Sequence, residues 1–301
     1  MAEVTLPTRA RVEAGLDDLV AENRFTIAVV FPAVGAVMLT ASAELLLPAA
    51  LTFNPYLVLF GTLVMRLPLV AGVAPLVDRK AGVGLLLLAL YAYSIEYVGT
   101  TTGLPYGAFE YGVDLGPMLL DTVPFGLPVF FFPLVVNAYL LMLLLLGDRT
   151  ESALVRLPAV IATVVLMDLV LDPGAVALGF WTYDLATAPL DVWPYSGGGS
   201  FYAVPWSNYV GWVLSATVAV GTLDWAFSRA GLRARLESCA FLLDDLVSFV
   251  ILWGVINAYF GQWIPVALAA LLGVGLWKTD RFDVPLPPWL ASPGTQQRAE
   301  N

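Results

Sequence analysis

The sequence predicts an all-α, polytopic integral membrane protein with about eight transmembrane helices and both termini in the cytoplasm. Of the 301 residues, 59% are apolar and 13% are charged, and the mean hydropathy is +0.81. Soluble domains carry about 25% charged residues, so this chain has roughly half the charge expected of one. Long apolar runs and a one-sided distribution of basic residues specify the fold class further.

Eight apolar runs predict the transmembrane helices, because a hydrocarbon core of about 30 Å is crossed by roughly 20 apolar residues in a helix. The runs lie at about residues 25–48, 55–77, 82–101, 118–147, 154–176, 201–226, 240–260 and 262–277. They form one expected transmembrane domain, residues 25–278. We expect an interfacial helix in the preceding cytoplasmic segment, 1–24, and a flexible cytoplasmic tail in 279–301.

The positions of the basic residues test this arrangement. Thirteen of the 14 Lys and Arg residues lie in the N-terminal segment, in the C-terminal tail or in alternate connections. The intervening connections contain none; these are 49–54, 102–117, 177–200 and the turn near Gly261. Basic residues collect in cytoplasmic loops, so the pattern predicts a multi-pass protein of the cell membrane with both termini inside.

The residue types present exclude several classes of chemistry. The chain has no histidine and one cysteine, Cys239. These counts exclude a disulfide framework and a Ser-His-Asp triad, and they lead us to expect no metal and no haem. Both lysines, Lys80 and Lys278, lie in connections, so no span offers a lysine for a retinal Schiff base. A net charge of −10 argues against a nucleic-acid partner, and acid chemistry on a hydrophobic molecule, or transport, remains.

Charged residues within the apolar runs need partners or water. Arg66 lies near the middle of the second run, where an unpaired charge is costly. Its expected partner is Glu44, near the outer end of the first run, in a pair that serves either packing or the charge balance of a site. Asp121 begins the fourth run, where it either caps the helix or adds to that charge balance. Asp244 and Asp245 lie at the inner end of the seventh run, where we expect water to be close.

Three acids and one amide fall together in the outer half of the predicted bundle. Glu96 lies in the third run, Asp168 and Asp172 lie in the fifth, and Asn208 lies in the sixth. Asp168 and Asp172 are four residues apart and share a helix face. Buried carboxyl groups that lie close together repel one another when ionised, so we expect some to be protonated at neutral pH. A protonated buried carboxyl group is a proton donor, which makes this cluster a candidate functional site.

The outer connections are rich in aromatic residues, namely Tyr106, Phe109, Tyr111, Trp181, Tyr183, Trp193, Tyr195, Phe201, Tyr202, Trp206 and Tyr209. An interfacial aromatic belt explains part of this set. The alternative is a groove for a flat apolar ligand, or rings that face a developing cation. Proline and glycine are dense in the same segments, and broken helices near a membrane surface normally line a cavity.

An internal repeat is a further possibility, with chance as the alternative explanation. A shift of 72 residues aligns Glu96 with Asp168, Gly107 with Gly179, Phe109 with Trp181, and Tyr111 with Tyr183. The stretch Val123-Pro124-Phe125 similarly matches Val204-Pro205-Trp206. Such a repeat would place spans three and four parallel to spans five and six, with one acid from each facing a shared cavity.

Several stretches between residues 90 and 215 resemble a known family. They are Glu96-Tyr97-Val98-Gly99, Gly103-Leu104-Pro105-Tyr106-Gly107, Phe109-Glu110-Tyr111, Asp168-Leu169-Val170-Leu171-Asp172-Pro173, Gly179-Phe180-Trp181-Thr182-Tyr183 and Val204-Pro205-Trp206-Ser207-Asn208-Tyr209. Together they resemble the membrane carotenoid hydratases, which add water across a terminal double bond of an acyclic carotenoid. The acidic, lysine-poor composition makes the haloarchaeal branch of that family the best match. The resemblance implies a long apolar carotenoid and water as substrates.

The residues and the resemblance agree on a mechanism that requires no cofactor. Hydration of an unactivated alkene needs a proton on one carbon, a tertiary carbocation on the other, and then water. We expect Asp168 or Glu96 to be the acid and Asp172 to be the base for water. We expect the remaining site residues to bind substrate; they are Trp181, Tyr183, Trp206, Asn208, Phe109 and Tyr111.

Two other functions fit the same residues. The first is a proton-coupled transporter, or a lipid- or carotenoid-binding protein, that uses the same buried acids. The second is a structural partner that associates with other enzymes of a carotenoid pathway. Chemical change in the substrate separates the enzyme from both alternatives.

Overall fold

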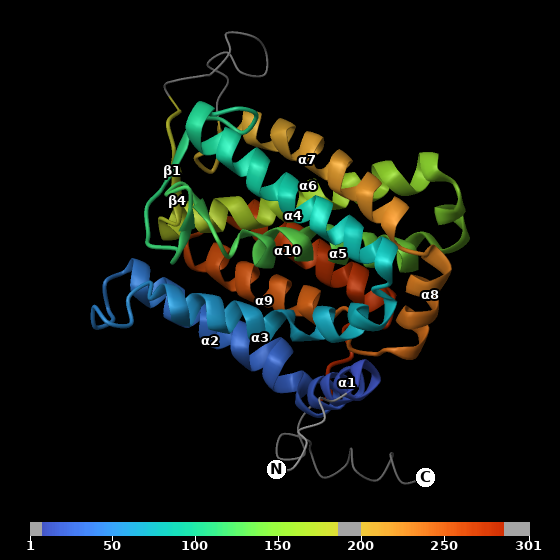
Figure 1. The fold of residues 1–301 in the computed structure, drawn as a ribbon. Coiled ribbons are helices and arrows are strands. Elements are labelled where there is room, and N and C mark those ends of the chain that lie inside the picture. Colours follow the sequence, from blue (N-terminus) through green and yellow to red (C-terminus); the bar gives the residue numbers. More distant parts are fainter. Residues whose placement is uncertain (1–7, 186–199, 286–301) are drawn as a thin grey trace, which may run out of the picture.

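The computed structural model describes residues 8–185 and 200–285, which form a helical bundle with three short β-ladders (Figure 1). The helices are α1 Arg9–Phe25, α2 Phe31–Ala43, α3 Pro55–Val73, α4 Arg79–Thr102, α5 Leu127–Leu146, α6 Ala153–Leu178, α7 Trp206–Ala226, α8 Arg229–Ser238, α9 Asp244–Tyr259 and α10 Trp263–Lys278. The strands are β1 Phe109–Tyr111, β2 Met118–Leu119, β3 Val123–Pro124, β4 Trp181–Tyr183, β5 Ser200–Phe201 and β6 Val204–Pro205. A π-helical turn, Thr26–Val30, joins α1 to α2, and 3₁₀ turns follow α3 and α5.

By length and composition, five helical segments among the described residues could cross a membrane. They are α1 with α2, then α3, α4, α5 and α6; the count is six if α7 and α8, which are bent by 85°, form one span. Helices α9 and α10 have 16 residues each. The mostly helical fold with several apolar helices long enough to cross a membrane is therefore confirmed, whereas the count of eight spans and the cytoplasmic termini stay predictions. Most of the predicted flexible tail, residues 286–301, lies outside the described residues, as do Trp193 and Tyr195.

Two predicted spans begin later than the hydropathy indicated. The fourth run was expected from residue 118 and the sixth from residue 201, but α5 begins at Leu127 and α7 begins at Trp206. In both cases the preceding residues form a β-hairpin, in which β2 pairs with β3 and β5 pairs with β6. Hydropathy does not distinguish an apolar hairpin from the first turns of an apolar helix.

The same order of elements occurs twice: helix, strand, hairpin, helix. The first unit contains α4, β1, β2, β3 and α5, and the second contains α6, β4, β5, β6 and α7. Strand β1 pairs antiparallel with β4, so that Phe109 faces Tyr183 and Tyr111 faces Trp181. Helix α4 packs on α7, and α6 packs on α5. This reciprocal packing is what a two-fold relationship between the units requires.

The offset between the units is not constant along the chain. The strands follow the predicted shift of 72 residues, but the two helices end on left-handed glycines, Gly103 and Gly179, that are 76 residues apart. Helix α4 is separated from β1 by Leu104 to Ala108, whereas only Phe180 separates Gly179 from β4. Glu96 therefore corresponds in the helices to Asp172, which lies at the same distance from the final glycine, and not to Asp168.

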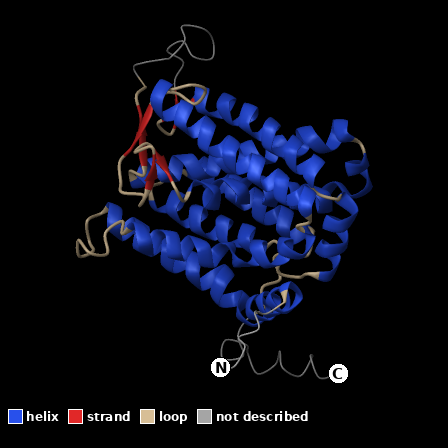
Figure 2. Cartoon of the chain, viewed as in Figure 1, coloured by secondary structure: helices blue, strands red, loops and turns tan. Residues whose placement is uncertain are grey.

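The strands gather at one end of the bundle and α8 lies at the other (Figures 1 and 2). Helix α8 begins with Arg229 and contains Arg233 and Arg235, so it belongs to the predicted cytoplasmic side. Between the ends, α9 is buried along most of its length, and Leu246 and Ile256 are fully buried. The β1–β4 ladder therefore marks the end that we expect to face outward.

Buried ion pairs occupy the α8 half of the bundle. Arg66 on α3 pairs with Asp245 at the start of α9, and Asn137 on α5 donates to the second oxygen of the same carboxylate. The expected partner, Glu44, is exposed at the end of α2, so that predicted pair is wrong. Asp245 was expected close to water, but its side chain is fully buried. Because α3 and α9 are far apart in sequence, the sequence alone did not indicate this contact.

Two other arginines are bound in the same way. Arg24 holds Asp244 through two hydrogen bonds of 2.7 and 2.8 Å and also reaches Asp283. Arg156, which is 2% exposed, lies 2.7 Å from Asp224. The first contact ties α1 to α9 and to the segment after α10, and the second ties α6 to α7.

Removal of one partner of the Arg66–Asp245 pair leaves a buried charge without compensation. We predict that Asp245→Ala lowers the free energy of unfolding by about 3–5 kcal/mol. Denaturant unfolding of the purified protein in detergent measures this change. The matched control is Glu13→Ala, which breaks the exposed Arg9–Glu13 pair and is expected to cost about 0.5 kcal/mol or less. An apolar double variant, Arg66→Met with Asp245→Leu, should recover most of the loss; an unchanged loss in it would contradict this explanation.

Candidate active site

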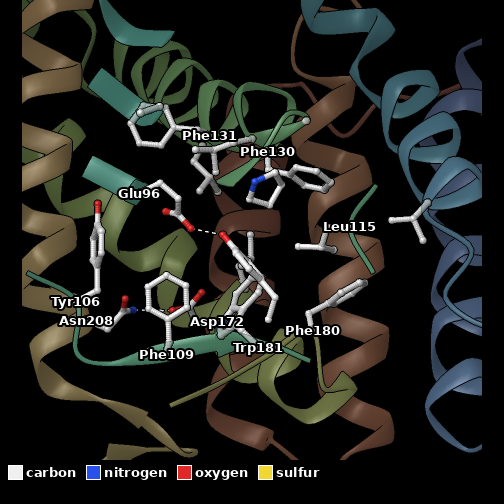
Figure 3. Close-up of a pocket in the computed structure, with 18 of the residues that line it drawn as sticks. Glu96, Tyr106, Phe109, Leu115, Phe130, Phe131, Asp172, Phe180, Trp181 and Asn208 are labelled. Atoms are coloured by element: carbon white, nitrogen blue, oxygen red, sulfur yellow. Dashed lines mark hydrogen bonds between the residues drawn. The ribbon is translucent and has the colours of Figure 1, made fainter. Parts of the chain in front are cut away.

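A cavity of about 170 Å³ lies among α3, α4, α5, α6, α7 and the β1–β4 ladder (Figure 3). Its wall is mostly apolar, with aromatic rings on several sides. The aromatic lining residues are Tyr106, Phe109, Tyr111, Phe130, Phe131, Phe180, Trp181, Tyr183, Trp212 and Trp253. The other polar side chains that line it are Glu96, Asp114, Asp172 and Asn208. An apolar space with a few convergent polar groups is typical of a small-molecule site.

The first carboxyl group in the cavity is Glu96. It projects from α4, seven residues before the glycine that ends the helix, and it points toward the centre of the cavity in Figure 3. The hydroxyl of Tyr111 on β1 donates a hydrogen bond to Glu96 Oε1. Burial raises the pKa of Tyr111, and the neighbouring Glu96 raises it further, so the phenol stays protonated and remains a donor. Glu96 itself lines the cavity.

The second carboxyl group is Asp172 on α6. Asn208 Nδ2, from the first turn of α7, lies 2.6 Å from Asp172 Oδ2. The Tyr183 hydroxyl lies 3.2 Å from the same oxygen and 3.1 Å from Asn208 Oδ1. Burial raises the pKa of Tyr183 as well, so this phenol is also a permanent donor. Asp172 and Asn208 are 3% and 2% exposed, which leaves their hydrogen bonds largely free of competing water.

Asp168 lies one helical turn from Asp172 and is fully buried. Asn208 Nδ2 also lies 3.2 Å from Asp168 Oδ2, so one amide joins the two carboxyl groups. The other oxygen of Asp168 has no hydrogen-bond partner among the described residues. Asp168 is not part of the cavity wall, whereas Glu96 and Asp172 are. Glu96 and Asp172 occupy equivalent positions in the two repeated units, and both line the cavity, as does the exposed Asp114.

The structure brings together most of the side chains that the sequence singled out. Glu96, Asp172, Asn208, Phe109, Tyr111, Trp181 and Tyr183 all line the cavity, and Asp168 joins it through Asn208. Trp206 does not: it is 43% exposed at the start of α7, and its ring contacts Phe201 and Tyr209. Trp206 therefore lies outside the cavity wall, and its role in substrate binding stays a prediction.

The predicted charge-balancing residues lie elsewhere. Asp121 is exposed in the turn between β2 and β3, with a positive φ of 54°, and the residue that caps α5 is Gly126. The expectation that Asp121 caps the helix is therefore wrong, and its role in charge balance stays a prediction. Arg66 is bound to Asp245, and Glu44 is exposed on α2. None of these residues lines the cavity.

Sequence reasoning missed several walls of the cavity. Phe131 stacks on Trp212 with ring centroids 5.8 Å apart, and Trp253 reaches the site from α9. Phe131 lies in an apolar run with no periodic signal. Trp253 approaches because residue 174 is glycine: a Cβ there would lie 2.9 Å from the Trp253 ring. The Pro173-Gly174 pair in the middle of an apolar helix was the available signal.

Among residues 8–185 and 200–285, no three His, Cys, Asp or Glu side chains are grouped so that they could hold a metal ion. The donors around the acids are phenols and an amide, which suits proton transfer. The arrangement can hold an apolar group against one carboxyl group while a second lies nearby.

Comparison with known proteins decides the family. A model of the carotenoid biosynthesis proteins matches residues 53–276 of this chain. The chain belongs to this family. A bisanhydrobacterioruberin hydratase of Haloarcula japonica is 63% identical over 287 residues, which are 95% of this chain and 94% of that protein. No solved structure matches the chain.

The matched region contains the whole wall of the cavity, from Pro55 to Trp253. It excludes Glu44, in agreement with the position of that residue outside the cavity. The region that the family model matches therefore contains the cavity, and the cavity is the candidate active site.

Asn208 is the amide on which both carboxyl groups of α6 depend. We predict that Asn208→Leu lowers the free energy of unfolding by about 1–3 kcal/mol, because it leaves buried polar groups unsatisfied. Thermal unfolding in detergent measures the change. The control is Thr222→Val on the same helix, whose hydroxyl bonds only to the carbonyl of Val218. Equal stability of the two variants would show that the Asn208 bonds contribute nothing.

Proposed function

We propose that this chain adds water across a terminal C=C bond of an acyclic carotenoid, converting a bisanhydrobacterioruberin-type substrate into its tertiary alcohol. The observation that carries the proposal is an apolar cavity with the carboxyl groups of Glu96 and Asp172 in its wall, in a chain 63% identical to a bisanhydrobacterioruberin hydratase. That relative supplies the substrate class. The cavity supplies an acid and a base.

Glu96 is the proton donor in this proposal. Of the two acids that the sequence nominated, Glu96 lines the cavity and Asp168 does not. The proton passes from Glu96 to the less substituted alkene carbon, and the π electrons form the new C–H bond. The other carbon becomes a tertiary cation, and Glu96 is left as a carboxylate that accepts the Tyr111 hydrogen bond. A carboxylic acid in an apolar site is suited to this step because it is weakly solvated.

Aromatic rings then surround the cation. Phe109 and Trp181 line the cavity, and the Phe109 ring lies 5.8 Å from that of Tyr183. The electron-rich face of an aromatic ring attracts a cation within about 6 Å of its centre. These rings hold no good nucleophile, so the cation persists until water reaches it.

Asp172 is the base that activates the water. The Asn208 amide and the Tyr183 hydroxyl both favour its ionised form by hydrogen bonding. Water attacks the cation through oxygen, and its proton moves to Asp172, so that alkene and water give one tertiary alcohol. Trp181 lines the cavity, and its buried indole N–H has no hydrogen-bond partner among the described residues. Proton exchange between Asp172 and Glu96 through cavity water completes the cycle, and no cofactor is consumed.

The proposal includes an arrangement of the protein in the membrane. We place the protein in the cell membrane with its multiple spans and both termini as the basic residues predict, so that the cavity lies near the outer surface. Water then reaches the acids from outside while the apolar substrate stays in lipid. Association with other enzymes of the carotenoid pathway would deliver that substrate.

Substitution of Glu96 and of Asp172 tests the mechanism. We predict that Glu96→Gln and Asp172→Asn each lower the hydration rate by about 10²–10⁴-fold, the usual contribution of acid–base catalysis. Asp168→Asn should retain more activity, because that side chain does not reach the cavity. The measurement is mass spectrometry of the carotenoid, in which each hydrated end gains the mass of one water. In D₂O the wild-type product should carry one carbon-bound deuterium beside each hydroxyl-bearing carbon.

Glu110→Gln is the matched control, because Glu110 lies beside Tyr111 on β1 but is exposed outside the cavity. It should leave the rate unchanged. Full alcohol formation by Glu96→Gln and Asp172→Asn would overturn the assignment. Uptake of carotenoid without a change in its mass would instead indicate a transporter or a binding protein.

A further inference from the structure

Two of the residues in the cavity wall are exposed, and they mark two different rims. Asp114 lines the cavity from the segment between β1 and β2, and its charged side chain is exposed. Phe130 is 36% exposed in the first turn of α5. Figure 3 shows Phe130 across the cavity from Tyr106 and Asn208. One rim therefore suits water, and the other suits an apolar chain.

The surface around the Phe130 rim is apolar. Phe125, just before α5, is 65% exposed, and Phe60 on the neighbouring α3 is 60% exposed. Leu59, the residue before Phe60, lines the cavity itself. Large exposed aromatic residues on spanning helices are in contact with lipid, so the rim between α3 and α5 opens toward the membrane interior.

The volume of the cavity limits how much substrate it holds. An apolar cavity of roughly 150 Å³ is enough for a six-carbon ring. A cavity of about 170 Å³ therefore takes one end group of an isoprenoid chain, together with little else. The rest of a long polyene has to lie outside, and it passes over one of the two rims. Because the polyene is apolar, we exclude a path over the charged Asp114 rim.

Gly126 stands at the apolar rim. It lines the cavity at the residue before α5, and a Cβ there would lie 3.4 Å from Leu59 on α3 and 3.8 Å from Phe130. Its φ of −74° and ψ of −2° are open to any residue, and it makes no side-chain cap. The backbone therefore does not require glycine here. A side chain at this position would extend into the space between Leu59 and Phe130.

We propose that the polyene enters the membrane from the cavity between α3 and α5, over Gly126, and that this opening selects long-chain substrates. The inference rests on the proposed function. Leu59, Gly126 and Phe130 are then specificity-determining residues for the part of the substrate that does not react. The reacting end lies inside against Glu96 and Asp172.

Substrates of two lengths test the opening. One is the full-length carotenoid, and the other is a trisubstituted acyclic alkene of one isoprene unit with the same reacting end. We expect Gly126→Leu to lower the hydration rate of the full-length substrate by about tenfold or more and to leave that of the short alkene unchanged, because the short molecule fits inside. The control is Gly221→Leu on α7, where a Cβ meets nothing within 4 Å; both rates should stay at the wild-type level.

Equal rates of Gly126→Leu and wild type on the full-length substrate would overturn the opening, as would equal losses on both substrates by a folded variant. Leu59→Phe narrows the same rim from the facing helix and decides the matter if Gly126→Leu does not fold. Its expected result is the same selective loss. Hydration of neither substrate by the wild-type protein would overturn the proposed function and this inference together, and is thereby distinguished from a failure of the opening alone.

Discussion

The antiparallel pairing of β1 with β4 is the interaction on which the candidate site depends. Six residues form it, and they bring Tyr111 and Tyr183 to the cavity from two segments that are far apart in sequence. Each phenol then reaches a carboxyl group on the helix that precedes its own strand: Tyr111 reaches Glu96, and Tyr183 reaches Asp172. A carboxyl group buried in an apolar bundle is costly without such a donor. The ladder therefore makes two buried acids tolerable at once.

The acids at the two ends of the bundle have different kinds of hydrogen-bond partner. Near α8, Asp244, Asp245 and Asp224 are bound by arginines, which fix the positions of these carboxyl groups. At the cavity, the hydrogen bonds that the described residues make to Glu96 and Asp172 come from phenols and an amide, which are neutral. Neutral donors do not commit a carboxyl group to its ionised form as a guanidinium does. This difference separates acids that hold the fold together from acids that can exchange protons.

The repeat shows why the sequence identified the members of the site but misjudged their pairing. Matching Phe109 and Tyr111 with Trp181 and Tyr183 gives the strand offset. The antiparallel ladder then pairs Phe109 with Tyr183 and Tyr111 with Trp181, as a two-fold relationship between the units requires. The segment between Gly103 and β1 is four residues longer than its counterpart after Gly179. Four residues are about one helical turn, so a constant shift places Asp168 opposite Glu96, when the residue in the equivalent position is Asp172.

The sequence by itself determined the mostly helical fold with apolar helices of membrane-spanning length and the family, and it nominated the candidate acids, because hydropathy, charge and residue type are local properties of the chain. It also located Asn208 and four of the five aromatic side chains that it assigned to the substrate. The tertiary structure decided the rest. Arg66 is bound to Asp245, 179 residues away, and Trp206 points out of the cavity. Helix packing also decides that Asp172 lines the cavity and that Asp168, one turn away, does not. Such contacts join residues that are distant in sequence, and they depend on helix rotation, which an apolar run with no amphipathic period does not specify.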